Sequence, residues 1–262
     1  MFNLHTHTYR CHHASGKDEE YVIKAIENGY DLIGFSDHAP YLFPNGYVSS
    51  FRMLPSEAEG YAKSINSLKE KYKGKIDIKL GFELEYYPAL FEKEIEFLKT
   101  FNYDYLILGQ HYVDNEYEDY AIYSDSPTKS PAVLDKYISQ VILGAKSGYY
   151  TYVAHPDLIN FKGDSELYIK KMTYMITELK KIDIPLEFNF LGFTAKRNYP
   201  NLDFWKIVSK VGNDVVIGLD AHNPSVYDDK ENLQKAKQIL QNLKPFFVIL
   251  NIGLIKFCVR FC

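Results

Sequence analysis

The stretch Phe2-Asn3-Leu4-His5-Thr6-His7 decides the fold, because it predicts a short strand that ends directly in two histidines. The same arrangement, an apolar run followed at once by histidine or carboxylate side chains, recurs along the chain. It is found at Ser36-Asp37-His38, Gly109-Gln110-His111, Val153-Ala154-His155-Pro156-Asp157 and Gly218-Leu219-Asp220-Ala221-His222. A barrel of parallel strands brings the carboxyl ends of all its strands to one face, so these side chains are expected to meet there.

Short runs rich in β-branched and aromatic residues alternate with longer segments of helical period, which is typical of repeated βα units. We expect strands near residues 2–4, 32–35, 76–80, 105–108, 150–153, 185–188 and 215–219, with a possible eighth at 246–250. Helices are expected near residues 18–29, 55–72, 90–101, 132–147, 165–182, 202–211 and 225–240. No linker or hinge separates them, so the 262 residues are expected to form a single α/β barrel domain over 1–262.

The composition of the chain indicates which classes of binding partner and which cellular location to expect. Thirty basic and 34 acidic residues give a net charge of −4 without any basic block, which disfavours a nucleic-acid ligand. The three cysteines, Cys11, Cys258 and Cys262, do not form a disulfide framework, and the N-terminus lacks a signal pattern, so a cytoplasmic location is expected. The apolar run 245–262 is too short and interrupted for a membrane span; a last strand plus a packed tail is expected, and its conformation stays open. The sequence leaves the oligomeric state open.

Imidazole and carboxylate are ligands that borderline divalent metals prefer. Candidate ligands follow the predicted strands in turn: His5 and His7, His38, Glu83, His111, His155, and Asp220 with His222. One such histidine alone would be better explained as a structural residue. Agreement among so many strand ends predicts a multinuclear metal site, for which zinc, iron and manganese are all suitable.

These motifs also resemble a known family. His5-Thr6-His7, His13, Asp37-His38, Gly81-Phe82-Glu83, His111, His155-Pro156 and Asp220-Ala221-His222 are similar to the motifs of the polymerase and histidinol phosphatase (PHP) superfamily. The resemblance runs from residue 2 to about 224. It implies a distorted seven-stranded (β/α) barrel that holds up to three metal ions and hydrolyses phosphoesters.

The resemblance also implies how the ligands are shared among three ions. The first ion takes His5, His7, Glu83 and Asp220. Glu83 bridges to a second ion with His111 and His155, and the third is held by His13, His38 and His222. His12 and Cys11 are left out of the set, Cys11 being expected to be structural. Asn3 departs from the family, which often has Asp at this position, and a modest change in metal affinity is expected.

Other segments resemble the histidinol-phosphatase branch of the superfamily. They are Arg52-Met53, Glu57, Tyr61, residues 68–72, Gly81-Phe82-Glu83-Leu84-Glu85-Tyr86, residues 102–105 and His155-Pro156-Asp157-Leu158. They imply L-histidinol phosphate as the substrate. At a metal site of this kind we expect a metal-bound hydroxide as the nucleophile, because metal binding can lower the pKa of water to about 7. Two alternatives stay open: a phosphoesterase for another small phosphomonoester or a nucleotide, and an inactive metal-binding accessory barrel.

Such a substrate needs groups for its phosphate, its amine and its imidazole. Arg197, in the loop 189–199, is the predicted phosphate clamp, because a guanidinium matches phosphate oxygens in a forked geometry; the alternative is a solvated arginine beside Lys196. Asp220 is a candidate proton donor as well as a ligand. Candidates for the amine are Glu85, Asp157 and Asp119, and those for the imidazole are Tyr112, Tyr117 and Phe190.

Overall fold

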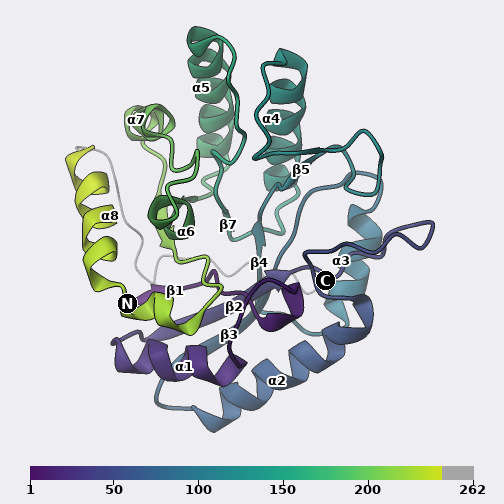
Figure 1. Ribbon diagram of the computed structural model, residues 1–262, viewed down its shortest axis with the longest axis vertical. Helices are drawn as coiled ribbons and strands as arrows, with labels where there is room; N and C mark the ends of the chain where they lie inside the picture. The colour runs from purple at the N-terminus through teal and green to yellow at the C-terminus, as the bar shows by residue number, and fades with distance from the viewer. Residues whose placement is uncertain (244–262) are drawn as a thin grey trace.

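The computed structural model describes residues 1–243. Seven parallel strands form one sheet in the order β1-β2-β3-β4-β7-β8-β9, and the helices surround it (Figure 1). The strands are β1 (Phe2–Asn3), β2 (Leu32–His38), β3 (Asp77–Glu83), β4 (Tyr105–Leu108), β7 (Tyr152–Val153), β8 (Leu186–Asn189) and β9 (Val215–Gly218). The predicted distorted (β/α)7 barrel, formed as a single domain, is thereby confirmed.

The barrel closes between its first and last strands. Thr6 and Ala221 form a parallel bridge, and the His7 amide donates to the Ala221 carbonyl at 3.0 Å. The Asn3 side chain stabilises this closure by hydrogen bonds to both sides of it. Its amide nitrogen donates to the His5 carbonyl at 3.1 Å, while its oxygen accepts from the Leu219 amide at 2.9 Å. An aspartate at this position has no N–H to donate, so the amide serves the closure of the barrel.

The barrel interior is packed around Tyr105, which is fully buried and donates its hydroxyl to the Leu4 carbonyl at 2.7 Å. Glycines on the neighbouring strands leave room for this ring. A Cβ on Gly34 would lie 2.3 Å from the Tyr105 hydroxyl oxygen, and one on Gly81 would lie 2.5 Å from the ring. The interior below the rim is therefore solid, and the polar side chains meet only at its upper end.

The helices cover the outside of the sheet. They are α1 (Asp18–Glu27), α2 (Ala58–Lys71), α3 (Phe91–Lys99), α4 (Pro131–Lys146), α5 (Ser165–Lys181), α6 (Phe190–Thr194), α7 (Leu202–Val211) and α8 (Lys230–Asn242). Short 3₁₀ helices lie at Tyr9–Cys11, Pro55–Glu57 and Pro224–Asp228. Helix α1 shows why they form: acidic Asp18 and Glu19 occupy its first turn, Tyr21, Val22 and Ala25 are buried, and Gly29 follows with φ 73°. Among the described residues, no helix is both long enough and apolar enough to cross a bilayer.

The main differences from the predicted elements lie at the rim. Strands β2 and β3 run three residues further than expected, through His38 and Glu83, and these two residues are paired in register. The sequence missed the hairpin of β5 (Tyr112–Val113) and β6 (Ile122–Tyr123), and the short helix α6, because both are too brief for a periodic pattern. The possible strand at 246–250, the tail 245–262, Cys258 and Cys262 lie outside the described residues.

Candidate metal centre

The predicted ligands converge on one rim of the barrel. His5 and His7 follow β1, His38 and Glu83 end β2 and β3, His111 and His155 follow β4 and β7, and Asp220 and His222 follow β9. His13 reaches the same place from the segment after the 3₁₀ helix Tyr9–Cys11. All of them are buried except His13, which is exposed, and His222, which is half-buried. The placement that the sequence predicted for these nine residues is therefore what the structure shows; their binding of metal is taken up below as a proposal.

Glu83 lies at the middle of the cluster. Its Oε1 is 2.7 Å from His155 Nε2 and 3.5 Å from His111 Nε2. Its Oε2 faces the other way, at 3.4 Å from His5 Nε2, 3.4 Å from His7 Nε2 and 3.1 Å from His38 Nδ1. Burial alone raises the pKa of the Glu83 carboxyl, but the surrounding histidines, His111 first among them, hold that pKa well below its usual value. The two oxygens of one ionised carboxylate thus serve two groups of histidines.

Asp220 closes the cluster from the last strand. Its Oδ1 is 3.1 Å from His7 Nε2 and 3.5 Å from His5 Nε2. Donor atoms of His5, His7 and Asp220 all lie within 4.8 Å of one another, as do those of His5, Glu83 and His155. Asp220 and His155 both have positive φ, 50° and 30°, a conformation that costs about 1–3 kcal/mol and is concentrated at functional sites.

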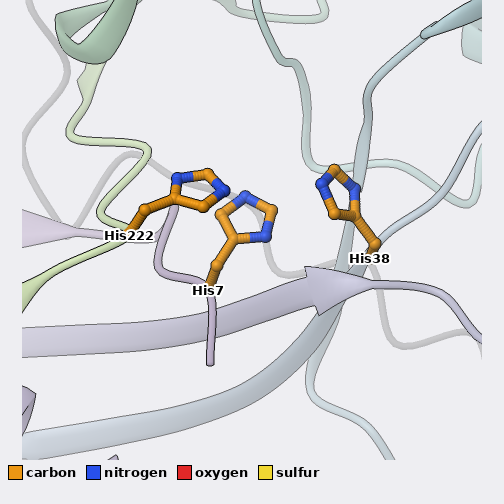
Figure 2. Close-up of side chains that lie close together, drawn as sticks. All are labelled: His7, His38 and His222. Atoms are coloured by element: carbon orange, nitrogen blue, oxygen red, sulfur yellow. The ribbon is translucent and has the colours of Figure 1, made fainter. Parts of the chain in front are cut away.

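A third group of histidines lies further out. Figure 2 shows the rings of His7, His38 and His222 directed into one space from β2 and from the segments after β1 and β9. Their donor atoms lie within 4.8 Å of one another. The rings of His7 and His222 are stacked with centroids 4.1 Å apart, and His222 Nε2 is 2.9 Å from His13 Nε2.

Most of these imidazoles are oriented by an acceptor at Nδ1. Three carboxylates take part: Glu187 at 2.8 Å from His5, Asp37 at 3.4 Å from His7, and Glu85 at 2.8 Å from His111. Backbone carbonyls do the same for His13, at 2.7 Å, and for His222, at 3.0 Å. With Nδ1–H donating outward, each Nε2 presents its lone pair to the centre, as metal-binding histidines do. The sequence analysis missed Glu187, whose only signal is an acidic residue in a strand that is otherwise buried.

The donor set fits divalent cations. If both Nδ1 atoms carry the proton, Nε2 of His5 and His7 face each other with lone pairs at 3.1 Å, and Nε2 of His222 and His13 do so at 2.9 Å. Such pairs repel unless a cation lies between them. Glu83 Oε2 and His38 Nδ1 are also buried, and they lie 3.1 Å apart without forming a well-aligned hydrogen bond. A buried polar atom of this kind is costly unless a ligand or ion satisfies it.

The histidines differ in pKa according to the charged groups beside them. Burial lowers the pKa of His5, but the carboxylates beside it, Glu187 first among them, outweigh burial and raise that pKa to about 10. In the outer group, burial and the charge of His7 act together and lower the pKa of His222 to about 3. Burial and His7 likewise lower the pKa of His38 well below its usual value. The imidazoles of His38 and His222 are therefore neutral at pH 7, which is the form that binds a metal.

A cavity of about 500 Å³ opens onto the cluster. Arg197 lines it together with the histidines and donates to the Tyr199 hydroxyl at 2.8 Å. The remaining lining is partly aromatic and comprises His13, His38, Ser50, Phe51, His111, Tyr112, Tyr123, His155, Leu191, Tyr199, Asp220 and His222. Arg197 is thus placed where the sequence analysis expected it, and a cavity with one cation beside the ligand cluster suits a small anionic molecule.

The candidates for substrate contact are only partly brought to this cavity. Of Tyr112, Tyr117 and Phe190, Tyr112 lines it, whereas Tyr117 packs near Phe43 and Phe190 is buried near Phe193. Asp119 is exposed and is not among the lining residues.

Glu85 and Asp157 are both fully buried, and neither is among the residues that line the cavity. Glu85 is paired with Arg52 and His111, and Asp157 accepts from the Asn201 amide at 2.6 Å and the Trp205 indole at 3.0 Å. The structure thus gives each of them partners within the protein.

His12 and Cys11 lie at the edge of the cluster. His12 is exposed, with Nε2 4.0 Å from a Glu57 carboxylate oxygen, so it stays outside the ligand set. Cys11 is buried, and its Sγ with donor atoms of His13 and His222 forms a group within 4.8 Å. The thiol therefore lies nearer to the histidines than a purely structural residue needs to.

Comparison with known proteins agrees with this geometry. The model of the family described as PHP domain matches residues 3–190. The chain belongs to the PHP domain family. The match covers most of the PHP barrel and includes Glu83, His111 and His155, whereas Asp220 and His222 lie beyond it.

Several PHP relatives carry one name. A protein of Deinococcus radiodurans named "Probable histidinol-phosphatase" is 28% identical over 240 residues, which cover 86% of this chain and 87% of that protein. A histidinol-phosphatase of Bacillus subtilis is 34% identical over 118 residues, 42% of this chain and 43% of that protein. The resemblance to the histidinol-phosphatase branch is thereby confirmed.

A solved PHP structure shares the fold. It is histidinol phosphate phosphatase from Lactococcus lactis, complexed with Zn, L-histidinol and phosphate. The match has a TM-score of 0.72 and 20% sequence identity and covers 94% of this chain and 95% of that one. At this sequence identity, the structural similarity is evidence for the barrel fold alone.

Proposed function

We propose that this protein is a metal-dependent phosphomonoesterase that hydrolyses L-histidinol phosphate to L-histidinol and inorganic phosphate, a step of histidine biosynthesis. The observation that carries the proposal is the convergence of histidine nitrogens on the Glu83 and Asp220 carboxylates, beside a cavity that Arg197 lines. The names of the PHP relatives, and the ligands in the solved structure from Lactococcus lactis, support this substrate.

The residues present would hold three divalent cations, zinc, iron or manganese. His5, His7, Glu83 and Asp220 would hold the first; Glu83, His111 and His155 the second; His13, His38 and His222 the third. When bound, divalent cations supply positive charge for phosphoryl oxygens and lower the pKa of water to about 7, so that a nucleophile is available. The carboxylates of Glu83 and Asp220 partly balance the positive charge of the cations, and neutral imidazoles such as that of His222 add no further charge.

Arg197 would bind the phosphate from the open side of the cavity. Its guanidinium is steadied by the Tyr199 hydroxyl at 2.8 Å, which leaves other N–H groups for the phosphate oxygens. The lining also includes Phe51 and Tyr112, whose ring centroids lie 6.0 Å apart with the ring planes at 28°. Tyr112 is therefore the favoured contact for the substrate imidazole among the three aromatic candidates.

Asp220 acts in this proposal as a ligand rather than as a proton donor. Burial alone raises the pKa of its carboxyl, but the neighbouring charges, that of His5 first, hold that pKa well below its usual value. A carboxylate that stays ionised is a good acceptor for cations and a poor acid. The leaving alkoxide would then take its proton from water in the cavity.

The test is phosphate release from L-histidinol phosphate by purified, metal-quantified protein, beside a panel of nucleotides and sugar phosphates. Selective turnover that a chelator abolishes supports the proposal. Selective turnover of another panel member would keep the phosphoesterase and change its substrate. Absence of turnover by protein with nearly three bound metals would replace the enzyme by an accessory metal-binding barrel.

A further inference from the structure

Arg52 is a buried arginine behind the candidate metal centre. It lies between β2 and α2, is 2% exposed, and follows Phe51, which lines the cavity. Its guanidinium donates to both oxygens of Glu85, at 2.9 and 3.1 Å, and to Glu116 through Nε at 3.1 Å. A further bond goes to the Ala39 carbonyl at 3.1 Å. One side chain therefore joins the segments after β2, β3 and β5.

A histidine also belongs to this network of charged side chains. A buried arginine needs paired carboxylates, and here two carboxylates, Glu85 and Glu116, surround one guanidinium. Glu85 Oε1 accepts a further hydrogen bond from His111 Nδ1 at 2.8 Å. Because Oε1 also accepts from Arg52 Nη2, the guanidinium and the imidazole share one oxygen. The position of the imidazole is thus linked to that of the guanidinium through this shared oxygen atom.

The same guanidinium supports the wall of the cavity. It lies 4.4 Å from the centroid of the Phe51 ring, a cation–π distance. The Phe51 ring in turn contacts His38, with centroids 5.0 Å apart, and His111, at 5.7 Å. Arg52 therefore reaches the site along two routes, through the Glu85 carboxylate and through the Phe51 ring.

We propose that Arg52 is a positioning residue, which fixes the His111 imidazole through Glu85 with Nε2 directed at Glu83, and fixes the cavity wall through Phe51. The inference rests on the proposed function only in taking His111 as a metal ligand. Arg52 itself is not among the residues that line the cavity. Its planar, five-donor fork is what the network uses, so a lysine of the same charge does not replace it.

The test uses Arg52→Lys and Glu85→Gln, alone and together, with Zn²⁺ titrated into the metal-free protein in competition with a chelator. Outer partners of ligating histidines are worth about 10–100-fold in metal affinity. Each single variant is expected to weaken one metal equivalent about tenfold or more and to leave the others unchanged, and the double variant to lose no more than the worse single variant. Wild-type affinity for every equivalent in Arg52→Lys, or fully additive losses, would overturn the proposal.

Glu94→Ala is the matched control. Glu94 holds the same segment, because its Oε2 accepts from the Leu42 amide at 3.0 Å, yet it has no hydrogen bond to Glu85 or His111. The control is expected to bind all equivalents as the wild type does. Loss of the same equivalent in this control would show that any loosening of the segment suffices, and the specific role of Arg52 would be withdrawn.

Nitrogen NMR of His111 in metal-free protein gives a readout that needs no catalysis. The wild type is expected to show the Nδ1–H tautomer, with a hydrogen-bonded proton that Arg52→Lys loses or shifts; an unchanged signal would count against the link. If Arg52→Lys does not fold, Glu116→Gln, which removes the other anchor, must weaken the same equivalent or the proposal fails. An inactive wild type whose variants lose that equivalent would refute the proposed function alone. An active wild type with unaffected variants would refute this inference alone.

Discussion

Gly109 lies directly against Glu83: a Cβ built on Gly109 would be 2.0 Å from Oε1 of the Glu83 carboxylate. Glu187 has the same relationship to Gly218, where the distance would be 1.7 Å. In both cases a glycine on the adjacent strand end leaves the space that a buried carboxylate fills. The strands thus make room for the acidic groups around which the histidines gather, which explains why a small residue is needed beside each of them.

Gly109→Ala is expected to disrupt the centre while the barrel still folds. The new methyl group would push the Glu83 carboxylate away from His155 and His111, and a displacement of about 1 Å at a reacting site costs about 100-fold in rate. Loss of metal equivalents and of activity, with little change in melting temperature, would be seen by metal analysis, assay and calorimetry. Gly60→Ala in α2 is the control, because a Cβ there meets nothing within 4 Å; it is expected to keep full activity.

Glu83→Gln tests whether one carboxylate serves two ions. Its two oxygens face different histidines, with His155 and His111 on one side and His5, His7 and His38 on the other. Loss of the negative charge should therefore weaken two metal equivalents together. Metal analysis after equilibrium dialysis checks this, and loss of a single equivalent would exclude the bridge.

Arg197→Ala should raise KM for the phosphomonoester and lower kcat/KM by about 10–100-fold, since hydrogen bonds to charged groups contribute about 1.5–3 kcal/mol. Metal content should not change, because Arg197 has no contact with the histidines among its hydrogen bonds. Steady-state kinetics on the metal-loaded protein would show this. Lys196→Ala provides the comparison, because Lys196 is the neighbouring exposed cation and is not among the residues that line the cavity. Equal effects of both variants would mean that Arg197 is a solvated loop residue.

The sequence predicted the strand ends well because each ligand is tied to a strand by its position in the chain. The register of the parallel strands then determines which residues become neighbours. For example, the alignment of β2 with β3 pairs His38 with Glu83. What the sequence does not contain is the direction of a side chain behind the rim. Glu85 and Asp157 follow strands as the ligands do, yet they are turned to Arg52 and Trp205, partners that are distant in the chain. Glu187 was missed for the same reason.

Glu94 should make stability depend on pH between about 4.5 and 8. Burial raises the pKa of its carboxyl from 4.5 to about 8, against the opposing effect of the Leu42 amide. Between these values the folded protein holds one proton more than the unfolded chain. The contribution of Glu94 is therefore fully present below pH 4.5 and is lost as pH rises through 8, with a slope of up to about 1.4 kcal/mol per pH unit.

Glu94→Gln isolates this effect, because glutamine is neutral at every pH and resembles the protonated acid in shape. Urea unfolding of both proteins at pH 5, 6, 7 and 8, read by circular dichroism, gives the difference in free energy of unfolding at each pH. The wild type should lose stability relative to the variant as pH rises, since its carboxyl must then either keep its proton against the solvent or ionise in an apolar site. Parallel curves for the two proteins would mean that the carboxyl is ionised throughout and that solvent or a cation reaches it.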